Sequence, residues 1–240
     1  MELPTSKVSY KLVPGPTRPQ TEADISFRGG VPRMPAELEL PRCQRCGDEQ
    51  TFFFQVAFPE KHLWHGWVMC VFSCSSCFDK YDPSPRGHYT APDVLPDGYL
   101  DRLETDYRII LYPADSPTAR MRTEARQLLK FEEIRFEKLR VNNRHYETKL
   151  GGKPFWIDDP RPIEEIEYMG GHFVFIGQFM EEFNFFPALE DAPPPKASGQ
   201  WIRTKPVKAY GLFHVGGNFL FFGTTSPRVI PPRVLIVPTK

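Results

Sequence analysis

The clearest pattern in the chain is a pair of apolar runs in its first third. The first reads Phe-Phe-Phe-Gln-Val-Ala-Phe and the second reads Trp-Val-Met-Cys-Val-Phe-Ser. Short runs rich in aromatic and β-branched side chains are typical of buried strands. The pattern therefore predicts strands at 51–58 and 67–73, joined by a loop at 59–66.

Weaker apolar segments lie on either side of this pair. They predict an edge strand at 8–13, a short strand at 25–28 and another strand at 108–112. Residues 78–100 are rich in Pro, Asp, Gly and Tyr, so we expect irregular structure there.

One segment has the features of a helix. Asp115-Ser116-Pro117 offers a capping side chain followed by proline, which is a common helix start. The sequence predicts a helix over 118–129 that extends as far as Lys138.

The chain then repeats an earlier pattern. A Gly-Gly pair ends at Gly30, 25 residues before Gln55, and a second pair ends at Gly152, 26 residues before Gln178. Proline follows two residues after each pair, and each Gln lies in an aromatic run. Because the order matches and the spacing is nearly equal, we predict an internal duplication within a single domain, 1–240.

The duplication predicts two pseudo-symmetric halves that share one core. The first half covers 25–112 and the second covers 146–240, with a helical connector at 113–145. The second half also carries a proline-rich insertion at 187–206.

The end of the second half is predicted to be β-structure. Two segments, 210–215 and 218–223, are expected to form a hairpin across Gly216-Gly217. A last edge strand is predicted at 229–237, because two prolines interrupt it.

Four of the five cysteines form two Cys-x-x-Cys pairs that bracket the two strongest strands. Cys43 and Cys46 precede the first strand, and Cys74 and Cys77 follow the second. Four thiolates complete a tetrahedral shell and leave no position for water, which is typical of a structural zinc site. The stretch between the pairs exceeds the roughly 15–20 residues of an ordinary ribbon, but a two-stranded hairpin fits within it. We therefore predict one structural Zn²⁺.

Other interpretations of these residues remain open. The paired cysteines could instead be buried or redox-active thiols. Cys70 lies inside a predicted strand and is expected to be a core side chain. His62 and His65 could replace a cysteine as ligands, but four thiolates are already present, so loop positions beside Trp64 and Trp67 are favoured.

Composition narrows the possible partners. The chain has 30 basic and 30 acidic residues, so its charge gives no reason to expect nucleic acid or an anionic membrane. The first residues contain no apolar signal segment, and no run of about 18 apolar residues occurs. We expect a cytoplasmic protein, where paired cysteines bind metal more often than they form disulfides.

No arrangement of residues indicates an enzyme. Adjacent acids such as Glu132-Glu133 and Asp158-Asp159 are ordinary solvated charge, and no Gly-x-Ser-x-Gly motif is present. The expectation is a non-enzymatic protein.

The order of the motifs resembles a known family. Gly-Gly-x-Pro, then Phe-x-x-Gln, is similar to the YwqG-like family. The cysteine pairs before and after these strands are similar to those of the eukaryotic programmed-cell-death-protein and Tsr-type adaptors, and here they are Cys43, Cys46, Cys74 and Cys77 around Gln55. The resemblance covers both repeated cores but not residues 78–145.

The resemblance carries expectations for fold and function. It implies a mainly β domain with internal pseudo-symmetry. The eukaryotic adaptors are similar to dedicated chaperones that hold a ribosomal protein before assembly, and the bacterial members imply an immunity or protein-interaction role. A shared fold is better evidence for architecture than for activity.

The sequence therefore predicts a mainly β (α+β) protein that binds another protein or an extended peptide, chaperone- or adaptor-like. We expect strand addition in a groove between the halves. Each Gln also has a structural interpretation, in which a buried amide bonds backbone across the pseudo-twofold axis. The candidate contact residues are Gln55, Trp156, Gln178, Phe179, Phe183 and Phe185.

Two other functions are compatible with the sequence. One is an immunity-type inhibitor of a toxin. The other is a zinc ribbon that binds nucleic acid, although Arg42, Arg45 and Lys61 are the only basic residues close to the predicted hairpin.

Overall fold

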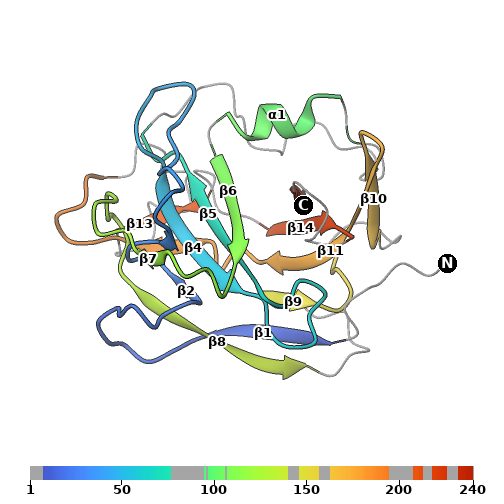
Figure 1. Ribbon diagram of the computed structural model, residues 1–240, viewed down its shortest axis with the longest axis horizontal. Helices are drawn as coiled ribbons and strands as arrows, with labels where there is room; N and C mark the ends of the chain where they lie inside the picture. The colour runs from blue at the N-terminus through green and yellow to red at the C-terminus, as the bar shows by residue number, and fades with distance from the viewer. Residues whose placement is uncertain are drawn as a thin grey trace.

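The structure is a computed structural model. It describes residues 8–76, 95, 97–105, 107–139, 146–156, 163–194, 208–212, 218–225 and 232–239. The protein is mainly β, as predicted, and α1 (Tyr99–Leu103) is the only helix in the described residues. This helix is far too short to cross a membrane, and no other described segment offers a membrane-spanning helix. Within the described residues, eleven strands form one antiparallel sheet that curls until it is nearly closed (Figure 1).

Ten of these strands follow one path across the sheet. In order they are β15 (Val234–Thr239), β14 (Asn218–Thr224), β11 (Gly171–Phe179), β9 (Lys149–Gly151), β1 (Ser9–Pro14), β8 (Glu132–Leu139), β2 (Phe27–Arg28), β4 (Thr51–Ala57), β5 (Trp67–Ser73) and β6 (Tyr107–Pro113).

Five short strands lie off this path. β10 (Glu165–Tyr168) pairs with β11. Two small two-stranded sheets consist of β3 (Arg33–Pro35) with β7 (Ala119–Met121) and β12 (Phe185–Pro187) with β13 (Ala209–Gly211).

The two strongest predicted strands are confirmed as β4 and β5, which pair with each other, and 108–112 lies within β6. Every side chain of β4 is buried, because both faces of the sheet are covered there. The main core is aromatic. The ring of Phe54 lies 4.5 Å from that of Phe179, which in turn lies 4.7 Å from Phe221. These contacts join strands of both halves, so the halves share one core, as expected.

The predicted edge strand at 8–13 is wrong in its position. It is β1, which lies inside the sheet between β8 and β9. All six residues pair with β8, from Ser9 opposite Leu139 to Pro14 opposite Ile134. The polar, proline-rich character of the N-terminal segment indicated an edge, but partners distant in sequence supply both neighbours of this strand.

The predicted helix over 118–129 is also wrong. Residues 119–121 form β7, and 132–139 form β8, so the 113–145 connector is not helical in its described part. Helix-favouring Ala, Arg, Glu and Leu residues set the prediction, but long-range strand pairing overrides such weak propensities. The alternation of Ile134 and Phe136 with charged residues was the signal for β8.

The predicted hairpin at the end of the chain is wrong as well. β13 pairs with β12, whereas β14 pairs with β11 and β15, so the two segments belong to different sheets. The turn at 213–217 and most of the insertion at 187–206 lie outside the described residues. The last strand, β15, stands at one end of the sheet path, as the prediction of an edge strand requires.

The two Gly-Gly motifs adopt the same backbone conformation, one that glycine tolerates best. The φ angles are 61° and 70° at Gly29 and Gly30, and 70° and 71° at Gly151 and Gly152. This left-handed region favours glycine. A Cβ on Gly29 would also lie 2.0 Å from the carbonyl oxygen of Lys130, so a side chain is excluded there.

The two glutamines that follow the Gly-Gly pairs, Gln55 and Gln178, each fasten the Gly-Gly turn of their own half. The fully buried Gln55 donates from Nε2 to the Ile25 carbonyl (3.2 Å) and accepts at Oε1 from the Arg33 N–H (2.8 Å). Gln178 makes the same two bonds, to the Glu147 carbonyl and from the Phe155 N–H, each 2.8 Å. The backbone bonding is as interpreted, but it runs within each half instead of across the axis.

Other features match between the halves. A register shift in β4 between Phe52 and Phe54 corresponds to one in β11 between Phe175 and Gly177. The sheet order also reads as five strands followed by their counterparts in reverse, with β8 opposite β1 at the centre. A duplication would produce these correspondences, and the duplication itself stays a prediction.

The loop between β4 and β5 anchors the first half in the second. Trp64 is fully buried and donates from Nε1 to the Thr224 carbonyl (3.1 Å). It occupies space left by Gly223, where a Cβ would lie 2.3 Å from the indole ring. His62 accepts from the Trp64 N–H at Nδ1 and donates from Nε2 to the Ile176 carbonyl, each over 3.0 Å.

The first prediction concerns the two glutamines. Gln178→Leu keeps the volume but leaves the Phe155 N–H and the Glu147 carbonyl unpaired. Each such buried group costs about 1–3 kcal/mol. We expect urea denaturation to give a correspondingly lower free energy of unfolding. The exposed Gln44 is the control, and a Gln178→Leu protein as stable as Gln44→Leu would contradict the assigned role.

The second prediction concerns pH. Burial lowers the pKa of His62 to about 4, while the unfolded chain titrates near 6.5. The unfolded state therefore binds more protons between these values, so stability is full above about pH 6.5 and falls on the way to pH 4. The loss is on the order of 3 kcal/mol.

The test compares denaturation curves across this pH range. His62→Gln should flatten the slope, whereas a His65→Gln change at the exposed neighbour should preserve it. Equal slopes for wild type and His62→Gln would refute the assignment.

Candidate metal centre and groove

Three of the four predicted ligands lie together. The Sγ atoms of Cys43, Cys46 and Cys74 all lie within 4.8 Å of one another, and those of Cys46 and Cys74 are 3.6 Å apart. Thiolates about 2.3 Å from a tetrahedral ion lie roughly 3.8 Å from one another, so these spacings suit one shared ion. Cys77 falls outside the described residues. The cluster could hold a metal ion.

The first knuckle is a tight turn before β4. The Gly47 N–H donates to the Cys43 carbonyl, and the Cys43 N–H donates to the Asp48 carbonyl, each over 2.9 Å. Gly47 has a φ of 74°, which lets the chain reverse directly after Cys46. The turn places the Cys43 side chain in the interior and leaves Cys46 exposed.

The second knuckle follows the end of β5. Cys74 is buried, and its sulfur accepts a hydrogen bond from the Ser76 N–H over 3.4 Å. A donor to sulfur favours the thiolate that a metal needs. The hydroxyls of Thr51 and Ser75 lie 2.6 Å apart and connect this turn to the start of β4.

The centre is also tied to the segment after α1. The Gln44 N–H donates to the Thr105 carbonyl over 2.9 Å, and the Cys43 sulfur lies 3.8 Å from the same oxygen. One ion at this point would therefore fasten the knuckle, the β4–β5 hairpin and the chain between α1 and β6.

The remaining cysteine and the two loop histidines are not part of the cluster. Cys70 is buried in β5 with its sulfur 3.7 Å from Gln55 Oε1, and burial raises the pKa of its thiol. Both ring nitrogens of His62 already have partners, and His65 is exposed on its loop. Cys70 is a core side chain, as predicted.

The candidate contact residues are in three kinds of environment. Gln55, Gln178 and Phe179 are fully buried, so a partner cannot reach them in this structure. Trp156 is partly buried and donates from Nε1 to the Ile163 carbonyl (3.1 Å). Phe185 is partly buried in β12.

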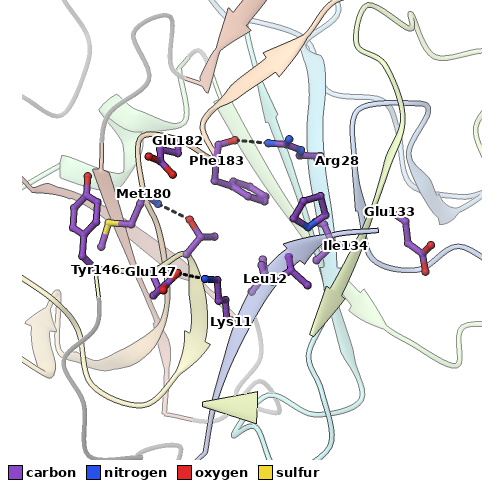
Figure 2. A pocket seen from close by; sticks show the side chains of 13 residues that line it. Lys11, Leu12, Arg28, Glu133, Ile134, Tyr146, Glu147, Met180, Glu182 and Phe183 are labelled. Carbon is purple, nitrogen blue, oxygen red and sulfur yellow. Dashed lines mark hydrogen bonds and ion pairs between the residues drawn. The ribbon is translucent and has the colours of Figure 1, made fainter. Parts of the chain in front are cut away.

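Phe183, the sixth candidate, lines a groove between the halves. The groove has a volume of about 670 Å³ and lies where β1 separates from the chain before β9. Its centre is apolar, with the Phe183 ring near Leu12 and Ile134 (Figure 2). Tyr146 and Met180 extend this apolar surface at one end.

Charged side chains border the groove. Lys11 Nζ lies 2.8 Å from a Glu147 carboxylate oxygen (Figure 2). This hydrogen bond raises the pKa of Lys11, and the nearby carboxylates of Glu137 and Glu182 raise it further. Glu147 and Glu182 line the groove together with Lys11, so this end of the groove has more carboxylates than ammonium groups.

The other end of the groove has a fixed cation. Arg28 forms an ion pair with Glu132 through Nε and donates from Nη1 to the Phe183 carbonyl over 3.2 Å. Its guanidinium also lies 5.4 Å from the centre of the Phe183 ring. These contacts hold Phe183 in place at the groove wall.

The groove does not offer a strand edge. The Leu12 N–H already donates to the Thr148 carbonyl (2.9 Å), and Pro14, the next residue that faces away from β8, has no N–H. A ligand in the groove would therefore contact side chains, so strand addition at this place is not supported.

Sequence reasoning missed most of the groove. Lys11, Arg28, Tyr146 and Met180 come from segments that were given structural or no roles, and only the register of β1 brings them together. The one local signal was an aromatic residue, Tyr146, next to the repeated motif, and the structure shows that its side chain is exposed.

Comparisons with known proteins do not assign this chain to a family. Neither a scan against protein-family models nor a search of curated proteins gives a match to this chain.

The third prediction concerns the cysteine cluster. We expect about one metal ion per chain by elemental analysis of the purified protein. Cys46→Ser should lose the ion and lower the melting temperature by roughly 10 °C or more, because metal-binding energy stabilises the fold. Cys70→Ser is the control and should keep the ion. Full metal content in Cys46→Ser would show that the cluster is not the site.

Proposed function

We propose that this chain is a non-enzymatic module that binds another protein or an extended peptide, with a structural zinc ion in its first half. The observation that carries the proposal is the groove between the halves, with its apolar centre and charged ends. A volume of about 670 Å³ accommodates several side chains of an extended segment.

The chemistry of the groove favours binding over catalysis. Its cations have fixed partners, since Lys11 pairs with Glu147 and Arg28 with Glu132. A general acid or base needs a pKa near the working pH and a position at the reacting atom. Exposed aromatic and apolar side chains such as Tyr146, next to the thioether of Met180, are typical of contact surfaces.

The proposed zinc site is a closed, structural one. It contains Cys43, Cys46 and Cys74 together with Cys77, and four thiolates leave no coordination position for a substrate. The zinc supports the hairpin that contributes Phe54 to the shared core. In this proposal the metal stabilises the scaffold and the groove recognises the partner.

The fourth prediction tests the groove by substitution. Tyr146→Ala and Glu182→Lys change exposed groove residues without emptying the core. Loss of a central aromatic contact typically costs about 2 kcal/mol, roughly thirtyfold in affinity. We expect both variants to retain much less of the protein that co-purifies with wild type from host lysate.

The control for this experiment is Met169→Ala. Met169 is 72% exposed at the turn between β10 and β11, outside the groove. It should retain the partner at the wild-type level. Equal retention by all variants would place binding elsewhere, and the absence of any co-purifying protein after crosslinking would contradict a binding function.

A further inference from the structure

Both cations among the described residues that line the groove already have carboxylate partners. Lys11 is bound to Glu147, and Arg28 is bound to Glu132, which is not itself part of the groove lining. An anionic ligand would have to displace one of these carboxylates before it could pair with a cation. The groove is therefore poorly suited to a phosphate group, a nucleic acid or an anionic lipid surface.

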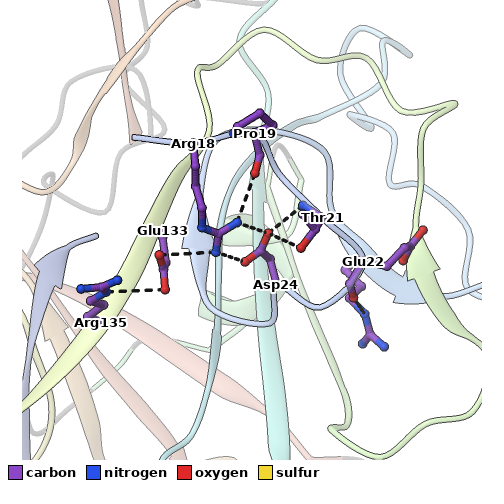
Figure 3. A network of polar contacts seen from close by, with 8 residues as sticks. Arg18, Pro19, Thr21, Glu22, Asp24, Glu133 and Arg135 are labelled. Carbon is purple, nitrogen blue, oxygen red and sulfur yellow. Dashed lines mark hydrogen bonds and ion pairs between the residues drawn. The ribbon is translucent and has the colours of Figure 1, made fainter. Parts of the chain in front are cut away.

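One groove carboxylate, that of Glu133, is neutralised within the molecule. Its Oε2 lies 3.4 Å from Arg18 Nη2, and its Oε1 lies 3.6 Å from Arg135 Nε (Figure 3). Arg18 also binds both carboxylate oxygens of Asp24, and Asp24 Oδ2 accepts from the Thr21 N–H over 2.7 Å (Figure 3). This network fastens the loop between β1 and β2 to β8, so Glu133 is not available to a ligand.

Glu182 is in a different situation. Among the described residues, it is the charged side chain of the groove that has no ion pair. It is exposed, and it faces the same space as Lys11, because the hydrogen bond to Glu147 and then the Glu182 carboxylate raise the pKa of Lys11. The Glu147 side chain is itself 33% exposed. Two accessible carboxylates thus share one ammonium group, and a cation from a ligand would balance them.

The apolar centre of the groove directly adjoins these carboxylates. Glu182 and Phe183 are consecutive in the chain, and the Phe183 ring belongs to the apolar centre (Figure 2). This ring is held in place by the ring of Phe54, at 5.4 Å between centres, and by the Arg28 guanidinium, also at 5.4 Å. A contact surface that is already fixed loses little conformational entropy when a ligand binds.

We propose that the groove binds an extended peptide segment in which a lysine or arginine lies within two positions of a large apolar side chain. This inference rests on the proposed function and names the class of ligand. The apolar side chain lies beside Phe183, and the cation lies between Glu147 and Glu182. The half-exposed ring of Tyr146 adds a cation–π contact at that end. Side chains i and i+2 of an extended segment point to the same side, so one segment can fill both places.

The fifth prediction concerns the sequences that the groove selects. A phage-displayed library of random nonapeptides is panned against the full chain, and the selected peptides are sequenced. We expect enrichment of lysine or arginine within two positions of a large apolar residue. Glu182→Lys should lose this preference, because it replaces the unpaired carboxylate with a second ammonium group beside Lys11.

The matched control is Glu181→Lys. Glu181 is exposed and precedes Glu182 in the chain, but it does not line the groove. Its backbone N–H donates to Asn218 Oδ1 over 2.8 Å, and the substitution keeps this bond. The control adds the same charge one residue away and should select the same basic peptides as wild type. Equal loss of the basic preference in both variants would overturn the proposal.

Binding measurements on one selected peptide test the charge pair directly. The probe is the most enriched peptide labelled with fluorescein, compared with a version whose basic residue is replaced by methionine. Fluorescence anisotropy should show that this replacement weakens binding to wild type roughly tenfold. On Glu182→Gln the same replacement should have a clearly smaller effect, because the carboxylate that pairs with the cation is gone. Equal effects on both proteins would overturn the proposal.

The outcomes separate this inference from the proposed function. Selected peptides that lack basic residues and are lost in Tyr146→Ala would overturn the ligand class but leave the groove as a peptide site. If no peptide is selected while a protein still co-purifies from host lysate, this inference is wrong and the proposed function stands. If neither a peptide nor a protein is retained, both are wrong.

Discussion

The structure depends on one antiparallel strand pair, β1 with β8. Among the strands that the structure describes, this pair is the only link in the sheet path between the five strands ending at β6 and the five ending at β15. The two strands of the pair are exchanged between the halves. β1 precedes β2 in the chain but pairs with β9, and β8 precedes β9 in the chain but pairs with β2. Neither half therefore contains all the strands of its own part of the sheet. Shared aromatic packing, from Phe54 to Phe179, completes the dependence of each half on the other.

Local features were predictable because their causes are local. Runs of aromatic residues identified β4 and β5, and Cys-x-x-Cys spacing identified a cluster that has three described members. The predictions failed at 118–129 and at β1. Helix-favouring residues there say little once distant strands supply the hydrogen bonds, and no local pattern reveals that a strand with charged and proline residues has neighbours on both sides.

In the candidate site, too, the features with local causes were predictable and those set by distant strand pairing were not. The cysteines are brought together by two turns next to adjacent strands, so their spacing was informative. The groove is formed by Lys11, Arg28, Tyr146 and Phe183, which come from four separate segments, and only the register of the sheet makes them neighbours. Gln55 and Gln178 stood out for the right reason, a polar group among aromatics, but their amides serve the fold because both ends are fully used by backbone.

The exchange of β1 and β8 also sets an order of events during synthesis. When the first half leaves the ribosome, β4, β5 and β6 can pair, and the cysteine cluster can gather beside them. β1, made first, must wait for β8 and β9, more than a hundred residues later in the chain. Contacts of such long sequence separation form slowly, and domains that complete late leave apolar strands exposed. The first strand to be made thus has no partner until more than half of the chain has been synthesised, and the apolar strands of the first half stay uncovered during that time.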